Sequence, residues 1–431
     1  MPTCWPVGEK VHLCGHNPAF VQQAPFVIIG GGVAGLIAAH TLEAAGHAPV
    51  LYEASDAVGG RVRTDEVDGF RLDRGFQVLL TEYPEVKRYL DLKALDVQAF
   101  RPGAHVHTRQ QHFRIADPLR EPAQLFRSAL SPVGTLQDKI KLAQLGLRLT
   151  RVSPEECFAG FDEQSTMDYL WDYGFSEQIV ERFFRPFFGG IFLEQKLETP
   201  AAMFRYIFKM FAQGSAVLPA GGIGAVPQQL AAKLTSTRVQ VSTCVRALEG
   251  DVVILEDGTR VTARAIIVAC APDRLFPQMA GELQWKSTTN LYYYSTHRLK
   301  ENRLINLVSD PTSTINTFTV LDEVAPTYKL RGQGGSLISV GLKEGLATDS
   351  EAQAEQDLLR HSGLPNDALR FLQRYEIRRA LPRLGAVAYT YYATQSRLID
   401  RVFLAGDQQL NGSLDAAMRS GRLAAEGALR T

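Results

Sequence analysis

The sequence has no hydrophobic run long enough to cross a membrane. A transmembrane helix needs about 20 mainly apolar residues, and no run of about 18 occurs in this chain of 431 residues. The first 25 residues also lack the basic start and apolar centre of a secretory signal. We therefore expect a cytoplasmic protein, and peripheral contact with a membrane stays open as an alternative.

Cysteine is rare and net charge is absent. The five cysteines are odd in number and widely scattered, which does not describe a disulfide framework. Lysine plus arginine and aspartate plus glutamate both number 46, so the charge balance indicates no nucleic-acid partner. With 45% hydrophobic and 21% charged residues, the composition is that of a globular protein. The length predicts two or three domains.

What the sequence does contain, from Phe26 to Glu53, is the order of strand, glycine turn, helix and strand that binds a dinucleotide. Gly30 allows the tight turn, Gly32 lets the backbone approach a pyrophosphate, and Gly35 lets the helix lie close to the strand. Glu53 ends the second strand, where a carboxylate accepts hydrogen bonds from ribose hydroxyls. The alternative is a set of small residues that serves packing alone.

The predicted helix starts at Val33 and Ala34, where free N–H groups face the phosphates. After Ala54, the chain reaches Gly60 and Arg61. The glycine permits close backbone approach, and the guanidinium offers a planar fork for phosphate oxygens. We predict a phosphate contact for Arg61, with a surface arginine as the alternative.

A second polar turn lies near the end of the chain. A short apolar strand leads to Gly406 and Asp407, and a long helix begins near Ser413. Asp407 at the carboxyl end of the strand could bind a chain of hydroxyl groups, and the start of the helix presents N–H groups to negative charge. The alternative is a capped helix that closes a domain.

Two blocks, GGGVAGL at 30–36 and YEASDAVGGR at 52–61, resemble the FAD-binding start of the flavin-containing amine oxidase superfamily. That group also includes protoporphyrinogen oxidases, phytoene-type desaturases and carotenoid isomerases. The segments at 73–77, 218–224 and 402–421 resemble later blocks of the same superfamily. The resemblance covers the FAD-binding part well and the substrate-binding part only loosely.

The resemblance implies FAD as the cofactor. The resemblance implies that the segment with Gly75, Phe76 and Gln77 runs past the flavin ring, and that the backbone of Val245 contacts adenine. Asp407 would contact the ribityl and phosphate region, and the helix start would face the carbonyl edge of the ring. The predicted FAD-binding residues are Gly30, Gly32, Val33, Ala34, Gly35, Glu53, Ala54, Gly60, Arg61, Gly75, Phe76, Gln77, Val245, Gly406, Asp407, Ser413, Leu414 and Ala417.

We expect the FAD to be non-covalent, because no cysteine lies between Pro382 and Gly406, where some members of the superfamily attach the flavin. No metal site is predicted, since the spacing of His12, Cys14 and His16 matches no common zinc pattern.

The expected fold is α/β plus α+β, with a Rossmann-like FAD-binding domain built from discontinuous segments and a second domain that combines an antiparallel sheet with a helical insertion. After an irregular extension over 1–24, the FAD-binding domain takes residues 25–82, 215–284 and 395–431. The substrate domain takes 83–214 and 285–394.

Residues 83–214 read as a largely helical insertion. The helical segments expected there are Tyr83 to Leu90, Pro118 to Leu130, Leu136 to Leu149, Ser165 to Tyr173 and Ser176 to Phe188. Aromatic residues are dense between Phe183 and Phe211. Such a cluster packs a core or lines an apolar substrate pocket, and the sequence leaves both open.

The resemblance implies an oxidoreductase in which a hydride passes from a substrate C–H bond to the flavin. Amine oxidases of this kind commonly place a lysine beside the flavin, whereas the strand Tyr292 to His297 offers Ser295, Thr296 and His297. His297 as a base has structural alternatives, so no catalytic residue is assigned.

The segment Tyr375 to Pro382 resembles bacterial relatives of protoporphyrinogen oxidases and phytoene desaturases. We therefore expect a dehydrogenase or desaturase that acts on a bulky, lipophilic small molecule. The electron acceptor would be oxygen or a quinone. An amine oxidase that produces peroxide is one alternative, and a flavin-requiring isomerase or redox-silent FAD protein is another.

Overall fold

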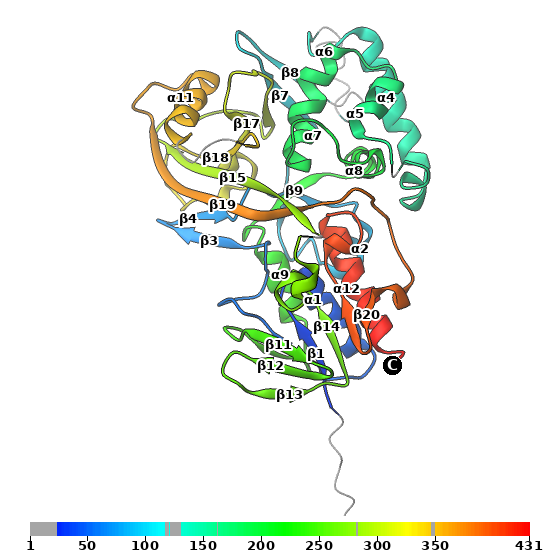
Figure 1. Cartoon of the computed structure of the whole chain (residues 1–431). Coiled ribbons are helices and arrows are strands. Elements are labelled where there is room, and N and C mark those ends of the chain that lie inside the picture. Colours follow the sequence, from blue (N-terminus) through cyan, green and yellow to red (C-terminus); the bar gives the residue numbers. More distant parts are fainter. Residues whose placement is uncertain (1–23, 117–119, 121–130, 162, 282, 346–349) are drawn as a thin grey trace, which may run out of the picture.

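The computed structural model describes residues 24–116, 120, 131–161, 163–281, 283–345 and 350–431. The expected extension over 1–24, apart from its last residue, and the expected helix Pro118 to Leu130, apart from Arg120, lie outside the described residues. Figure 1 shows two stacked parts: one contains α1 and α12, and the other contains the long strands β15 and β19 and the helices α4 to α8.

The first part is built on a six-stranded sheet. Its strands, in spatial order, are β10 (Arg238–Gln240), β2 (Val50–Tyr52), β1 (Phe26–Ile29), β14 (Ala265–Val268), β21 (Val402–Leu404) and β20 (Arg397–Ile399). All neighbours are parallel except β20, which runs antiparallel to β21. Every residue of β1 and β14 is buried, as expected for a parallel sheet covered on both faces.

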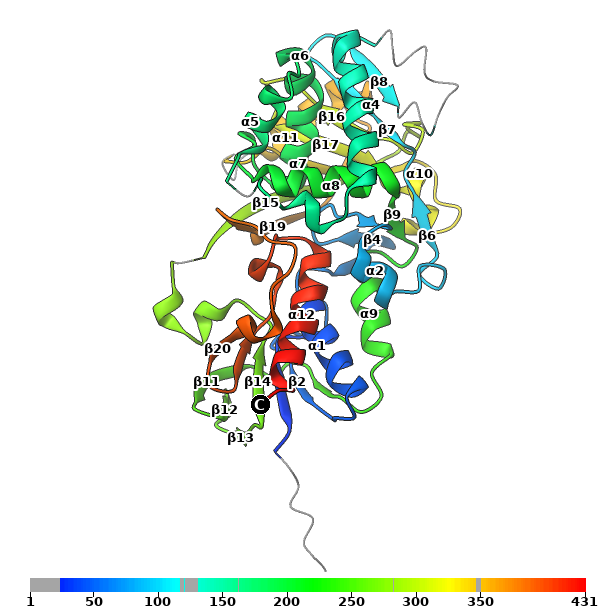
Figure 2. The ribbon, with the colours of Figure 1, turned by 90° about the vertical axis from the view of Figure 1, so that its right-hand side faces the viewer.

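Helices and a small sheet cover these two faces. The helices α1 (Val33–Ala44) and α12 (Leu414–Ala428) lie side by side on one face (Figure 2). The antiparallel sheet of β11 (Val245–Glu249), β12 (Val252–Leu255) and β13 (Arg260–Thr262) packs on the other. Nearby elements are β3 (Thr64–Val67), β4 (Phe70–Asp73), β5 (Leu79–Leu80), β9 (Ala216–Pro219), α2 (Pro84–Tyr89) and α9 (Ala225–Ala232).

The second part is built on a seven-stranded sheet. In spatial order its strands are β19 (Leu369–Arg383), β15 (Gln284–Ser295), β18 (Ser336–Leu342), β17 (Ile315–Val320), β16 (Ile305–Val308), β7 (Gly103–His107) and β8 (His112–Ala116). The pairing is antiparallel except between β16 and β7. The mixed α/β architecture and the antiparallel sheet agree with the expected fold class.

Helices lie on both faces of this sheet. One face packs against the helical segment, which contains α4 (Leu136–Arg151), α5 (Thr166–Asp172), α6 (Glu177–Ile179), α7 (Arg185–Phe192) and α8 (Ala201–Gln213). The other face packs against α11 (Glu351–Ser362), and α10 (Leu321–Val324) follows β17. None of the helices in the described part of the chain is long and apolar enough to cross a membrane.

The expectation of a largely helical insertion over 83–214 is wrong for residues 97–116. That stretch forms β6 (Val97–Ala99), β7 and β8. β7 alternates buried and less buried residues over its first four positions, whereas β8 is buried only at its last two, and both strands add an edge to the seven-stranded sheet instead of joining the helices. The division of the chain into FAD-binding and substrate domains stays a prediction.

Candidate functional site

One large cavity of about 1510 Å³ lies between the two sheets. Among the eighteen residues predicted from the sequence, all except Gly35 line it, although they come from segments far apart in the chain. The cavity also continues past these residues into the helical segment, where α4 and α8 form its wall. The structure therefore joins the predicted nucleotide site and the aromatic cluster in a single space.

In the glycine turn, the fold itself requires glycine at Gly30 and Gly35 but not at Gly32. Gly30 has a φ of +108°, and a Cβ at Gly35 would lie 2.0 Å from the carbonyl oxygen of Gly30. Gly32, the N-cap residue before α1, has no atom of the described residues within 4 Å of where its Cβ would be. No contact within the described part of the chain explains this third glycine, whereas a phosphate group lying over the start of the helix would.

Glu53 is held at the tip of β2 by short hydrogen bonds. Its Oε2 accepts from the backbone N–H of Gly31 at 2.6 Å, and its Oε1 accepts from the N–H and the hydroxyl of Ser55 at 2.8 and 2.7 Å. These bonds use both lone pairs of Oε1 and one of the two on Oε2, so Oε2 keeps one lone pair. The side chain is therefore fixed at the cavity wall and still able to accept a hydrogen bond from a hydroxyl group.

Arg61 and Asp407 form an ion pair across 346 positions of sequence. Arg61 also donates to the carbonyl of Ala380 at 3.0 Å, and its guanidinium lies 5.4 Å from the ring centre of Trp285. The sequence predicted a separate cofactor contact for each residue and gave no sign that they would meet. Their pairing connects the two ends of the chain at the middle of the cavity.

The start of α12 faces the cavity. Ser413 caps the helix, because its hydroxyl accepts from the N–H of Ala416 at 3.0 Å, and Leu414 and Ala417 line the wall beside it. The N-terminal end of a helix carries partial positive charge. This end can therefore stabilise an anion or a polarised carbonyl group in the cavity.

Part of the aromatic cluster packs the core and part lines the cavity, and the cavity's role as a substrate pocket stays a prediction. Phe184 and Phe204 are fully buried, whereas Phe183, Phe187 and Phe211 line the cavity. The wall at this end is mostly hydrocarbon, which suits an apolar guest.

The segment Tyr292 to His297, which was compared with the lysine-bearing strand of amine oxidases, does not line the cavity. The part of β15 that lines the cavity is its first half, from Trp285 to Asn290, and His297 is exposed outside it. This half carries Lys286, a residue that the sequence did not single out. The register with β19 is irregular between Lys286 and Thr288, within this cavity-lining half.

Lys286 is buried and engaged. Its ammonium group donates to Glu194 Oε2 at 2.8 Å, to Thr199 Oγ1 at 2.9 Å and to the carbonyl of Phe192 at 3.0 Å. The other oxygen of Glu194 accepts from the N–H of Thr199 at 2.6 Å. A buried lysine and glutamate 92 positions apart could not be paired from the sequence, because neither lies in a motif.

The two cysteines that line the cavity lie at its nucleotide end. Cys244 and Cys270 stand beside Val245 and near Glu53. Burial raises the pKa of the Cys270 thiol to about 11, so this thiol stays protonated and weakly reactive at neutral pH. The three described cysteines are free.

The fold and the cavity define a two-part protein with a dinucleotide-type turn in one part and an apolar chamber in the other. Residues 33–429 match the family of flavin containing amine oxidoreductases, and the chain belongs to that family. The flavin of this family is the group that the cavity has to fit. The open position at Gly32, the anchored Glu53 and the start of α12 agree with an elongated, anionic nucleotide.

The chain is 30% identical over 154 residues to an L-amino-acid oxidase from Bungarus fasciatus, which covers 33% of this chain and 30% of that protein. The chain thus spans about a third of the curated relatives it matches first.

Among solved structures, an oxidoreductase from Methanosarcina mazei superposes with a TM-score of 0.71 at 17% identity, over 93% of this chain and 100% of that one. Putrescine oxidase with bound putrescine superposes with a TM-score of 0.69 at 17% identity, over 95% and 99%. These structures show a shared fold.

Proposed function

We propose that this protein is an FAD-dependent oxidoreductase that oxidises a bulky, lipophilic small molecule. When bound, the flavin accepts a hydride from a C–H bond of the substrate. The protein supplies binding, orientation and exclusion of water. The observation that carries the proposal is the single cavity, which is polar and glycine-lined at one end and aromatic at the other.

The residues predicted from the sequence would hold the FAD in the following way. The turn from Gly30 to Gly32 and the start of α1 bind the pyrophosphate, and Glu53 accepts hydrogen bonds from the ribose. Asp407, already oriented by Arg61, accepts from the ribityl hydroxyls, and the start of α12 faces the ring. Gly35 acts only through packing, since it keeps α1 against the turn.

The apolar end supports a lipophilic substrate. Its wall contains Phe183, Phe187 and Phe211 together with Leu142 of α4. Glu194 is the carboxylate beside Lys286, and both of its oxygens already accept hydrogen bonds. Pairing with the ammonium group of a substrate would require this buried ion pair to break, which disfavours an amine.

The same helix supports peripheral contact with a membrane as part of the proposal. Leu136, Ile140 and Leu147 of α4 are 62%, 51% and 48% exposed, and all three border the cavity. A lipophilic substrate could enter from a lipid surface along this helix. Oxygen or a quinone would then reoxidise the flavin.

Amine oxidation remains the second candidate, because the first curated relatives are L-amino-acid oxidases. An anaerobic screen that follows the flavin absorbance tests the choice. Bleaching by a tetrapyrrole or a polyene supports the proposal, and peroxide formed in air from a monoamine, polyamine or L-amino acid supports the second candidate. Isomerisation of a double bond by the pre-reduced protein, without net oxidation, would overturn both in favour of an isomerase.

A further inference from the structure

A cluster of histidines lies in the second part of the molecule, behind the cavity wall. Four of the nine histidines gather here: His105, His107, His112 and His361. His105 and His107 are two apart on β7, so their side chains leave the same face of the strand. The alternate residues Ala104 and Val106 pack toward the helical segment, which places the histidines on the side of α11.

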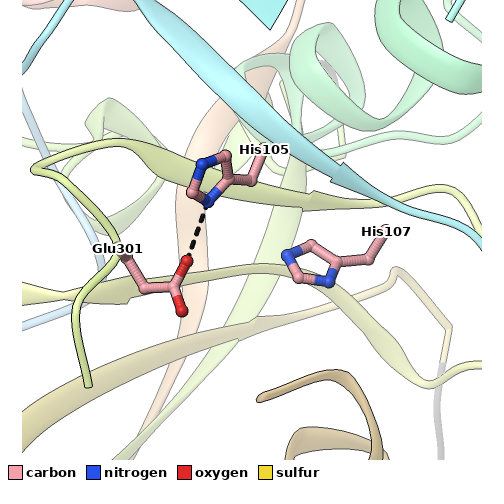
Figure 3. Close-up of side chains that lie close together, drawn as sticks. All are labelled: His105, His107 and Glu301. Carbon is pink, nitrogen blue, oxygen red and sulfur yellow. Dashed lines mark hydrogen bonds and ion pairs between the residues drawn. The ribbon is translucent and has the colours of Figure 1, made fainter. Parts of the chain in front are cut away.

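Glu301 joins two of these histidines. Its Oε2 lies 2.8 Å from Nδ1 of His105, and one ring nitrogen from each of His105 and His107 and a carboxylate oxygen of Glu301 lie within 4.8 Å of one another (Figure 3). Glu301 comes from the loop before β16, 196 positions after His105. The parallel pairing of β16 with β7 brings the loop to this place.

The cluster is shielded from solvent. His107 is 5% exposed, and the side chains of His105 and Glu301 are 14% and 15% exposed. Imidazole nitrogens and carboxylate oxygens are the donor atoms that bind transition metals in proteins.

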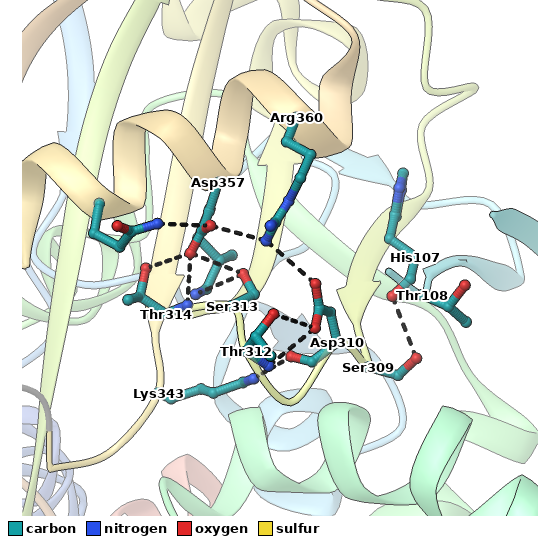
Figure 4. A network of polar contacts seen from close by, with 12 residues as sticks. His107, Thr108, Ser309, Asp310, Thr312, Ser313, Thr314, Lys343, Asp357 and Arg360 are labelled. Atoms are coloured by element: carbon teal, nitrogen blue, oxygen red, sulfur yellow. Dashed lines mark hydrogen bonds and ion pairs between the residues drawn. The ribbon is translucent and has the colours of Figure 1, made fainter. Parts of the chain in front are cut away.

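A second layer of polar contacts fixes the orientation of His107. Its Nε2 lies 2.9 Å from Oδ1 of Asn306, which settles the position of the ring, and its carbonyl accepts from the N–H of Ser309 at 2.8 Å. Asp310 follows Ser309 and lies 3.2 Å from the guanidinium of Arg360 on α11 (Figure 4). The network thereby ties the strand that carries His107 to the helix behind it.

His361, the next residue on α11, packs against the cluster and has a ring nitrogen without a hydrogen-bond partner among the described residues. The ring of His361 lies 5.8 Å from the ring of His107, centre to centre. Its Nε2 is shielded from solvent and has no hydrogen-bond partner among the described residues. A buried polar atom without a partner is uncommon in a folded protein.

We propose that His105, His107 and Glu301 form a binding site for one divalent transition-metal ion, such as Zn²⁺. Two imidazole nitrogens and a carboxylate oxygen form a donor set that zinc accepts, with water or His361 completing four ligands. Zinc holds such atoms at about 2.0–2.2 Å, which places tetrahedral donors about 3.4 Å apart, so the outer separations would shorten on binding and His105 Nδ1 and Glu301 Oε2 would move slightly apart. The histidines lie on the face of β7 opposite the cavity, which Ala104 lines, so the proposed role of the site is structural.

Titration of the full-length, FAD-loaded and chelator-treated protein with Zn²⁺ in a calorimeter tests this proposal. We expect one equivalent to bind. His105→Ala and Glu301→Gln should each weaken binding by at least about 100-fold, since each removes a ligand. Co²⁺ in place of Zn²⁺ should give a visible absorption band that both substitutions remove. Both residues are partly exposed, so the variants should keep the circular dichroism of the parent protein.

Two controls separate this site from other histidines. His297→Ala changes an exposed histidine outside the cluster, and the double substitution His12→Ala and His16→Ala changes the N-terminal extension. Both should bind Zn²⁺ like the parent protein. Absence of saturable binding, unchanged binding after Glu301→Gln, or loss of binding in the N-terminal double variant would each overturn the proposal.

Discussion

The variant Gly32→Glu tests whether nucleotide binding or the stability of the fold requires glycine at position 32. A Cβ at Gly32 meets no atom of the described residues within 4 Å, so the side chain enters free space in the cavity. Gly32 is also the N-cap of α1, where a negative side chain is favourable by about 0.3–1 kcal/mol. We therefore expect the melting temperature of the FAD-free protein to stay the same or to rise.

The same substitution should prevent FAD binding. A carboxylate placed about 4 Å from a phosphate charge costs about 4 kcal/mol at an effective dielectric constant of about 20. Because about 1.4 kcal/mol corresponds to a factor of ten, the affinity for FAD should fall by about 1000-fold. The assay is calorimetric titration of FAD into the FAD-free variant, together with the flavin content of the purified protein.

Two other glycines provide matched controls. Gly334 is exposed, lies outside the cavity and also has free space at its Cβ, so Gly334→Glu adds the same charge without loss of FAD. Gly35→Ala would place a Cβ 2.0 Å from a carbonyl oxygen and should destabilise the FAD-free protein by about 1–3 kcal/mol. An affinity of Gly32→Glu within threefold of the parent protein would refute the placement of the pyrophosphate.

Three further predictions concern stability and the state of the cofactor. Burial raises the pKa of Asp73 to about 6, so this residue stabilises the fold below about pH 4 and loses that contribution as the pH rises through 6. Between pH 4 and pH 8 the free energy of unfolding of Asp73→Asn should therefore rise by about 3 kcal/mol relative to that of the parent protein, as measured by denaturant unfolding. Parallel pH profiles of the two proteins would contradict this. Lys286→Met leaves Glu194 buried without its partner and should lower the free energy of unfolding by about 3–5 kcal/mol in the same assay. Adding Glu194→Gln should restore part of this stability. Equal stability of the single and double variants would count against the ion pair. Acid precipitation should release all flavin into the supernatant, and flavin retained on the polypeptide would show a covalent bond.

The glycine turn could be predicted because its causes are local. The positive φ of Gly30 and the contact between Gly35 and Gly30 arise within one turn, and the sequence pattern records both. Strands and helices around the cavity were also predicted where the hydrophobic residues kept one spacing over several positions. The strands β7 and β8 were missed because each has five residues, β7 alternates over only four of them and β8 does not alternate, so local sequence does not indicate their place in the sheet.

The contacts across the cavity could not be predicted, because they depend on how distant segments meet. Arg61 and Asp407 were each recognised, but no local pattern indicated that they pair. Lys286 was overlooked because local sequence does not indicate which half of β15 lines the cavity. The metal-binding cluster likewise requires the pairing of β7 with β16, which local sequence does not specify.

The most direct test of the central claim is the anaerobic rate of flavin reduction in the parent protein and in Gly146→Phe. Gly146 of α4 lines the apolar end of the cavity, and its Cβ would lie 3.7 Å from Phe208, so a phenylalanine should fill that end. Gln144→Phe adds the same side chain on the exposed side of the helix as a control. We predict that a polyene or tetrapyrrole reduces the flavin of the parent protein and of the control, and that Gly146→Phe keeps its full flavin content and is reduced at least about tenfold more slowly. Equal rates in all three proteins, or reduction of the parent protein by amines alone, would contradict the account.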